Sequence, residues 1–332
     1  MISAAIVGLG WWGRTIVREL ADSDRIRAVL GVDPDAECRH RAQALGIATA
    51  AGLQQALDTP GIDALVLCSP HRYHSAQIVA AAEAGKHVFC EKPFSTSCAE
   101  AEAALTAVRA AGLCLGVGHE RRFEPAVVEL RRRCASGDLG TLLAFEGNFS
   151  QDRFLALPAD SWRLSRAEAP VGPLSATGVH LVDLALSIFG EPSEVWARLS
   201  TRATTFENGD TLSVTLAFPQ GETAAITAIL TTPFLGRICV LGSRGWMEIR
   251  DRSHPESPAG WDVTTTLRGS TPDVRFFPPH RAVRDNLERF ADSIDGLAEY
   301  PVTTEEIRAT VRVCDAIARS AASGAVEPVR SW

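Results

Sequence analysis

The sequence of 332 residues lacks several features that would assign it to a specialised class of protein. No apolar run approaches the roughly 20 residues that a membrane-spanning helix requires, so we expect no membrane partner. The N-terminus has no basic region before its short apolar stretch and no small-residue cleavage site after it, which favours a cytoplasmic protein over a secreted one. The formal net charge is −7 and the basic residues are scattered. We therefore expect no nucleic-acid partner.

The eight cysteines also lack a pattern. None forms a C-x-x-C pair, and Cys68, Cys90 and Cys114 stand inside apolar runs that are typical of strands. A zinc site and a disulfide framework both need closer or patterned spacing. We therefore expect reduced, mostly buried thiols and no metal site, as is usual in the cytoplasm.

What the sequence does contain is the composition of a globular protein, with 46% hydrophobic and 22% charged residues, and enough length for two domains. Up to about residue 120, short β-rich runs alternate with helical patterns at 13–22, 35–45, 53–57, 74–84 and 97–111. The runs show little internal alternation, which is typical of parallel strands covered on both faces. The pattern predicts a doubly wound α/β domain, a Rossmann-type parallel sheet, over residues 1–120.

The pattern changes in the rest of the chain. Helical patterns at 124–135 and 173–189 precede a series of strand-like runs between residues 193 and 277, and helices return at 281–295 and 303–322. Strands in series, separated by turn residues and bracketed by helices, predict an α+β domain with an open, mainly antiparallel sheet. We assign this domain to residues 121–332 and expect it to bind the substrate and to mediate oligomerisation.

The stretch "IVGLGWWG" at residues 6–13 has three readings: a secretory signal, a strand followed by a glycine turn, or a seat for a pyrophosphate. The G-x-G-x-x-G spacing is a weak signal alone, but here a strand precedes it and a helix follows it, as the dinucleotide-binding motif requires. The amides at the start of the helix would then face an anion. The residues expected to contact the cofactor here are Gly8, Leu9, Gly10, Trp11, Trp12 and Gly13.

Asp33 ends the second expected strand, 20 residues after Gly13. At this place a carboxylate accepts hydrogen bonds from the ribose hydroxyls of NAD. The same carboxylate repels the 2′-phosphate of NADP, and no arginine follows directly in "DPDAE". We therefore predict NAD as the cofactor, and NADP is the alternative that the residues leave open.

Further motifs make a family resemblance specific. "SPHRYH" (69–74) follows the third strand, "CEKPFS" (90–95) follows the fourth, "WR" stands at 162–163, and "GPLSATGVHLVD" covers 172–183. Together with the glycine motif they resemble the Gfo/Idh/MocA family of NAD(P)-dependent oxidoreductases over essentially the whole chain. The resemblance implies hydride transfer between a nicotinamide cofactor and a secondary alcohol of a cyclic polyol or sugar derivative, a small-molecule substrate, and a homodimer or homotetramer.

The resemblance also implies roles for individual residues. Lys92 matches the active-site lysine and His180 the catalytic histidine. We assign His180 as the acid/base and Lys92 as the group that polarises the substrate oxygen, with the reverse assignment left open. The further residues placed along the cofactor are Ser69, Pro70, His71, His74, Glu91, Lys92, Pro93, Trp162 and Arg163, and those placed at the substrate are Lys92, His119, Thr177 and His180.

One position departs from the pattern. Many family members carry an aspartate four residues before the histidine, on the same helix face, and this chain has Ala176 there. The departure puts a standard polyol substrate in doubt. It leaves two other hypotheses: a dehydrogenase of alicyclic or aromatic dihydrodiols, and a non-catalytic regulator that only binds the cofactor. The presence of both Lys92 and His180 argues against the second.

Overall fold

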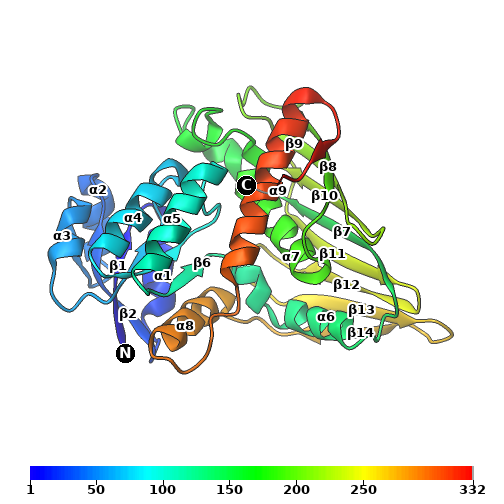
Figure 1. The fold of residues 1–332 in the computed structure, drawn as a ribbon, viewed down its shortest axis with the longest axis horizontal. Helices are drawn as coiled ribbons and strands as arrows, with labels where there is room; N and C mark the ends of the chain where they lie inside the picture. The colour runs from blue at the N-terminus through cyan, green and yellow to red at the C-terminus, as the bar shows by residue number, and fades with distance from the viewer. Residues whose placement is uncertain (331–332) are drawn as a thin grey trace. The chain divides into compact units, whose positions relative to one another are not determined.

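The computed structural model describes residues 1–330, whose contacts divide the chain into two compact units (Figure 1). The first unit contains Met1–Glu120 together with Arg281–Val311. The second contains Arg121–His280 and the chain from Arg312 onward. Both units contain one large sheet.

The sheet of the first unit is parallel and six-stranded, in the order β3-β2-β1-β4-β5-β6. Its strands are β1 (Ile2–Val7), β2 (Ile26–Val32), β3 (Ala48–Ala50), β4 (Ala64–Leu67), β5 (His87–Cys90) and β6 (Leu115–Val117). The helices that alternate with them are α1 (Trp11–Leu20), α2 (Ala36–Gln43), α3 (Leu53–Asp58), α4 (His74–Glu83) and α5 (Cys98–Ala110). The order reverses at β1 and β4, which is the switch point where doubly wound sheets bind ligands.

The core of this unit has two layers, one on each face of the sheet, and the side chains of β1 point alternately into them. Ile2, Ala4 and Ile6 pack with residues of α1 and of α8 (Ala282–Ile294) on one face. Ala5 and Val7 pack with residues of α4 and α5 on the other face. Because alternate side chains of a strand point to opposite faces, a strand buried on both sides has to be apolar throughout, as β1 is.

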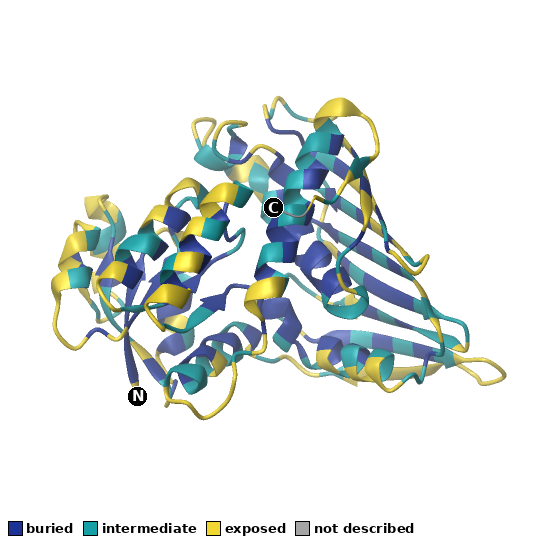
Figure 2. Cartoon of the chain, viewed as in Figure 1, coloured by how far each residue is buried: buried dark blue, intermediate teal, exposed yellow. Residues whose placement is uncertain are grey.

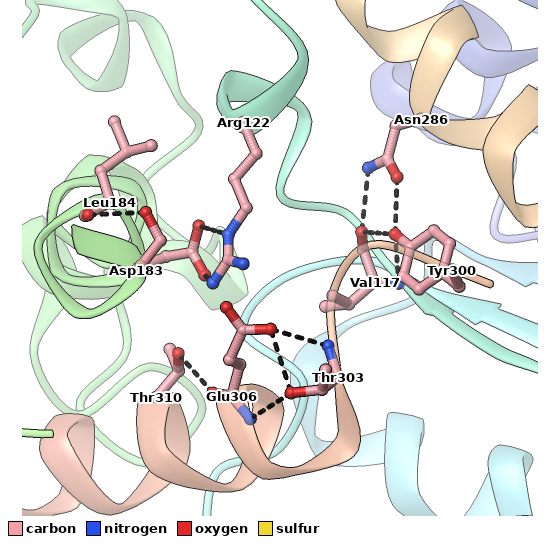
Figure 3. Close-up of polar contacts among 10 residues, drawn as sticks. Val117, Arg122, Asp183, Leu184, Asn286, Tyr300, Thr303, Glu306 and Thr310 are labelled. Carbon is pink, nitrogen blue, oxygen red and sulfur yellow. Dashed lines mark hydrogen bonds and ion pairs between the residues drawn. The ribbon is translucent and has the colours of Figure 1, made fainter. Parts of the chain in front are cut away.

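The segment Arg281–Val311 belongs to the first unit, whereas the sequence analysis assigned everything after residue 120 to one second domain. Two polar side chains attach it to β6, which is an edge strand of the sheet. Asn286 donates to the carbonyl oxygen of Val117 at 2.9 Å, and the backbone N–H of Val117 donates to the hydroxyl of Tyr300 at 3.1 Å (Figure 3). These bonds satisfy backbone groups that an edge strand leaves unpaired.

The sheet of the second unit has nine strands in the order β14-β13-β12-β11-β7-β10-β9-β8-β15. They are β7 (Leu142–Ser150), β8 (Glu194–Ser200), β9 (Thr211–Ala217), β10 (Thr223–Ile229), β11 (Leu235–Gly242), β12 (Gly245–Asp251), β13 (Trp261–Leu267), β14 (Asp273–Phe277) and β15 (Glu327–Pro328). All neighbouring pairs are antiparallel except β7 and β10, which run parallel. The expected α/β and α+β fold classes are confirmed.

One face of this sheet is covered and the other is open. Helices α6 (Pro125–Ala135) and α7 (Val179–Phe189) pack on the covered face, and α7 is buried over most of its length (Figure 2). Buried and exposed residues alternate along β8, and the exposed Trp196 lies on the open face. The second half of α9 (Thr304–Ser323) also belongs to this unit, where the backbone N–H of Ala197 donates to Ser320 at 2.8 Å.

The remaining structural features bear on partners. Among residues 1–330, no helix combines the length and apolarity needed to cross a bilayer. No group of three or more histidine, cysteine or acidic side chains in that range is arranged to hold a metal ion. All eight cysteines lie within the described residues and are free thiols.

Candidate functional site

The glycine loop joins β1 to α1, and each of its glycines has a distinct structural reason. Gly8 has a φ of 92°, and a Cβ atom there would lie 2.7 Å from the backbone carbonyl of Cys68 at the end of β4. A Cβ atom at Gly13 would overlap the carbonyl oxygen of Gly8. At Gly10, by contrast, no described atom lies within 4 Å of the Cβ position. The loop is therefore closely packed on one side and open on the other, which fits a pyrophosphate beside the start of α1.

Asp33 follows β2 and is hydrogen-bonded to the glycine loop. The backbone N–H of Leu9 donates to Oδ2 of Asp33 at 2.7 Å, and the N–H of Asp35 donates to Oδ1 at 2.9 Å. A carboxylate oxygen can accept more than one hydrogen bond, so both oxygens of Asp33 can still accept from ribose hydroxyls. Arg39 also lies here and donates to the carbonyl oxygens of Asp33 and Pro34 at 2.7 and 2.8 Å. No local pattern in the sequence indicates Arg39, because only the turn into α2 brings it back beside Asp33.

The segment after β4 is fixed by His74. The imidazole is fully buried, with Nδ1 2.9 Å from the carbonyl oxygen of Pro93 and Nε2 3.0 Å from that of Ser69. Burial lowers the pKa of His74, although the two carbonyl oxygens favour its charged form. His74 has no surface with which to touch a cofactor directly. It shapes the site by holding the Ser69 and Pro93 turns together, which corrects the direct contact that we expected. His71 is half-buried, and its ring lies 5.7 Å from that of His74.

Glu91, Lys92 and Pro93 follow β5 at the same edge of the sheet, and the Lys92–Pro93 peptide bond is cis. Glu91 is buried against the backbone of Gly118. Burial raises the pKa of the Glu91 carboxyl to about 7, although Trp12 and the Lys92 ammonium and backbone N–H favour its charged form. The sequence contains only two lysines. Lys86 precedes β5 and donates to the carbonyl oxygen of Ile62 at 2.8 Å. It therefore lies at the amino end of the strand, whereas Lys92 follows the carboxyl end.

The two tryptophans of the glycine loop have different environments. Trp12 is partly buried and packs against the core layer that contains Ile6. Trp11 is 48% exposed, and its ring lies 5.2 Å from that of Trp12. Trp12 is therefore a core side chain that also influences Glu91, whereas Trp11 leaves a large apolar surface at the start of α1.

His180 lies in the first turn of α7, in the second unit. A π-helix over Leu174–Gly178 leads directly into α7, where the sequence predicted one helix over 173–189. Single π-turns are frequent at functional sites. His180 is buried, and its ring lies 5.8 Å from that of Phe149 on β7. Thr177 is also buried, and its hydroxyl donates to the carbonyl oxygen of Pro173 at 3.4 Å. That bond uses the hydroxyl proton and leaves the oxygen able to accept, so the contact of Thr177 with the substrate stays a prediction.

Trp162 and Arg163 form a stacked pair on a loop of the second unit, with the guanidinium carbon 4.3 Å from the centre of the indole ring. Burial lowers the pKa of Arg163. The loop is held by Asn208, which is fully buried and donates to the carbonyl oxygens of Arg163 and Ala169 at 2.8 and 2.9 Å. The sequence marks Asn208 only as part of an Asn-Gly turn, so its structural role was missed.

Charged residues near His180 are paired with one another. Arg122 donates to both carboxylate oxygens of Asp183 at 2.6 and 2.8 Å, and both side chains are buried (Figure 3). Arg121 pairs in the same unit with Asp251 at 2.7 Å. Both arginines therefore take part in buried ion pairs of the second unit. His119, expected at the substrate, belongs to the first unit and is buried, with 2% of its surface exposed.

The structure thus gathers the glycine loop, Asp33, the Ser69 turn and the Glu91–Pro93 turn at the carboxyl ends of parallel strands in the first unit. In the second unit it places His180 beside Phe149 and stacks Trp162 with Arg163.

Comparisons with known proteins agree with this organisation. Residues 2–119 match the oxidoreductase family with an NAD-binding Rossmann fold, and residues 127–248 match the GFO/IDH/MocA C-terminal domain. The uncharacterized oxidoreductase YrbE of Bacillus subtilis is 31% identical over 81% of this chain and 78% of its own. The scyllo-inositol 2-dehydrogenase (NAD(+)) of the same organism is 28% identical over 94% of this chain and 91% of its own.

A solved structure gives the same result at the level of the fold. The aldose-aldose oxidoreductase from Caulobacter crescentus, crystallised with glycerol, superposes with a TM-score of 0.88 and 27% identity, covering 98% of this chain and 99% of that one. The N-terminal unit is an NAD-binding Rossmann fold. The chain belongs to the Gfo/Idh/MocA family of NAD(P)-dependent oxidoreductases.

Proposed function

We propose that this oxidoreductase transfers a hydride between NAD and a secondary alcohol carbon of a cyclic polyol or sugar derivative. The observation that carries the proposal is the position of Lys92. Of the two lysines, Lys86 lies at the amino ends of the strands and donates a hydrogen bond to the carbonyl oxygen of Ile62. Lys92 lies at the carboxyl ends, which also carry the glycine loop. A relative that is a scyllo-inositol dehydrogenase and a structural neighbour that is an aldose-aldose oxidoreductase support the substrate class.

In the proposed reaction, NAD supplies the carbon that accepts the hydride. The O–H bond of the alcohol breaks at the same time as the C–H bond, and His180 takes the hydroxyl proton. The ammonium of Lys92 donates to the same oxygen and stabilises the negative charge that develops on it. Trp162 and Arg163 are proposed to lie at the nicotinamide end of the cofactor.

A substrate screen tests the proposal. Purified protein and NAD are mixed with each of scyllo-inositol, myo-inositol, D-xylose, D-glucose and an alicyclic trans-dihydrodiol, and the NADH absorbance band is followed. We expect turnover of at least one inositol or sugar. Turnover of the dihydrodiol alone would replace the substrate class and keep the reaction, whereas no turnover with any of them would contradict the proposal.

Asp33 is proposed to select NAD over NADP through its charge. Purified protein should bind NADH more tightly than NADPH, and Asp33→Ser combined with Pro34→Arg should reverse that order, measured by fluorescence titration. Asp33→Asn is the matched control, because it keeps an oxygen that accepts from the Leu9 N–H while removing the charge. It should weaken the preference without reversing it. Equal affinities in the unmodified protein would contradict the role of Asp33.

The open face of the second sheet is proposed to be covered by another copy of the chain, in a homodimer or homotetramer. Trp196 on β8 and Phe276 on β14 are exposed, and large exposed apolar side chains are typical of such interfaces. Light scattering should give a mass that is two or four times the 35.6 kDa of the chain. The free thiols are consistent with a cytoplasmic location.

A further inference from the structure

One face of β7 packs in the core of the second unit and, at its end, contacts His180. Alternate residues of a strand share a face, so Phe145, Gly147 and Phe149 point to the same side. A Cβ atom at Gly147 would lie 3.1 Å from Leu181, and the ring of Phe149 lies 5.8 Å from that of His180, so α7 covers this face. Gln151 comes next on it. Its backbone N–H still donates to Ile229 at 2.8 Å, which extends the ladder with β10 beyond the end of the strand.

Three rings form a cluster at this point, and we call Phe149, Phe234 and His254 the aromatic corner. The ring of Phe149 lies 6.1 Å from that of Phe234 and 5.7 Å from that of His254, and Phe234 and His254 are 5.5 Å apart. Phe149 is buried behind the other two, which are partly exposed. His254 belongs to the segment after β12, more than 70 residues from His180 in the sequence. Phe149 contacts the ring of the proposed acid/base, and the partly exposed surface of the corner is formed by Phe234 and His254, which contact Phe149.

Hydrogen bonds at the aromatic corner fix the orientation of the Gln151 amide. Nδ1 of His254 lies 3.3 Å from the backbone nitrogen of Glu256 and 3.4 Å from the Glu256 carboxylate oxygen Oε1. Nε2 carries a proton both in the neutral ring that accepts from the Glu256 N–H and in the charged ring that pairs with the carboxylate. Nε2 then donates to Oε1 of Gln151 at 2.9 Å. The amide nitrogen of Gln151 consequently points away from His254. It donates to no other protein group in the part of the chain that the structure describes.

We propose that Gln151 and the aromatic corner bind the substrate at a position other than the carbon that is oxidised. In this subsite the amide nitrogen of Gln151 donates to a ring hydroxyl, and the C–H face of a cyclic polyol or sugar packs on Phe234 and His254. Ligand sites typically combine aromatic walls with a few oriented polar groups in this way. His254 acts as a positioning residue through Gln151. The inference rests on the proposed function and adds the residues that distinguish one ring polyol from another.

The test uses the best substrate of the screen with the full chain and NAD. Gln151→Met keeps the length of the side chain and removes the donor. We expect its KM to rise about 3- to 10-fold, the usual contribution of one neutral hydrogen bond, with kcat within about two-fold and NADH affinity unchanged. Gln220→Leu, at an exposed turn of the same unit, is the control and should keep the KM of the unmodified protein.

Deoxy analogues of that substrate separate binding from a structural effect. In the unmodified protein, one deoxy analogue should show the same rise in KM as Gln151→Met. In Gln151→Met, that analogue should show no further rise, because the bond is already lost. His254→Phe keeps an aromatic ring and removes the hydrogen bond to Gln151. With the complete substrate its KM should rise less than that of Gln151→Met, and with the deoxy analogue its KM should equal that of the unmodified protein. This variant also tests the proposal if Gln151→Met does not fold.

The outcomes distinguish this inference from the proposed function. If the unmodified protein oxidises a panel compound but Gln151→Met and His254→Phe keep its KM, the subsite is wrong and the proposed function stands. Additive effects of Gln151→Met and every deoxy analogue would likewise overturn the subsite. If the unmodified protein oxidises no panel compound, the proposed function fails and the subsite fails with it.

Discussion

Glu91 is a buried carboxylic acid next to the lysine on which the proposed chemistry depends. The glutamate looks like an ordinary loop residue in the sequence, and we expected it to lie along the cofactor. In the structure its carboxyl group packs against Gly118. Burial disfavours the charged carboxylate and raises the pKa of Glu91 to about 7. Its environment therefore makes the stability of the first unit depend on pH.

We predict that Glu91→Gln becomes more stabilising as the pH rises. Between pH 4.5 and about 7 the folded protein keeps a proton on Glu91 that the unfolded chain has lost, so the free energy of unfolding falls through this window. The variant lacks this titration and should gain up to about 3 kcal/mol relative to the unmodified protein by pH 8. Urea unfolding at pH 5, 6, 7 and 8 measures the difference. A difference that stays constant over this range would mean that Glu91 titrates normally.

At the scale of the element, helix α8 packs on the parallel sheet of the first unit and contributes to its stability, although α8 is remote from that sheet in the sequence. Phe290 on α8 is fully buried, and its ring lies 5.7 Å from Phe89 on β5 and 6.4 Å from Tyr300. The following helix, α9, begins with a capping box in which the Thr303 and Glu306 side chains each accept from the other's backbone N–H, at 3.2 and 2.8 Å (Figure 3). Helix α8 and the first part of α9, up to Val311, are therefore anchored parts of the first unit.

We predict that Phe290→Ala lowers the free energy of unfolding by about 3–5 kcal/mol, the usual cost of removing a buried phenylalanine. NADH affinity should fall with it at temperatures near the lowered melting point, because the helix packs on the sheet that carries the glycine loop. Leu297→Ala, in the exposed loop after α8, should change stability by no more than about 0.5 kcal/mol. Thermal unfolding with and without NADH checks both variants. Equal effects of the two changes would show that α8 does not support the sheet.

For the whole molecule, the proposed reaction needs one residue from each unit, Lys92 from the first and His180 from the second. We predict that Lys92→Ala or His180→Ala lowers turnover by roughly 10²–10⁴-fold. NADH affinity should stay within a few-fold, because neither change touches the glycine loop or Asp33.

The double variant Lys92→Ala/His180→Ala provides the check on joint action. It should be only slightly slower than the slower single variant, since residues that act together are not additive. Steady-state kinetics on the best substrate and NADH titration measure all three proteins. Near-normal turnover in either single variant would make that residue structural.

The sequence alone determined the fold class and the family. Strand and helix patterns, and motifs such as the glycine turn and Glu-Lys-Pro, depend on spacing within a few residues, and local spacing is directly visible. The helix expected at 173–189 was right in extent, but its first turn is a π-helix, because backbone hydrogen-bond registration also depends on packing against the sheet. The roles of Lys92 and His180 stay predictions.

Only the tertiary structure decided which distant residues meet. Arg281–Val311 joins the first unit because α8 buries an apolar face that β1 and β5 complete. Arg122 pairs with Asp183 across 61 positions, and His254 orients Gln151 across 103. Such contacts depend on strand order and on how helices pack against the sheets. No local pattern carries that information, so the glycine motif was visible in the sequence while the aromatic corner was not.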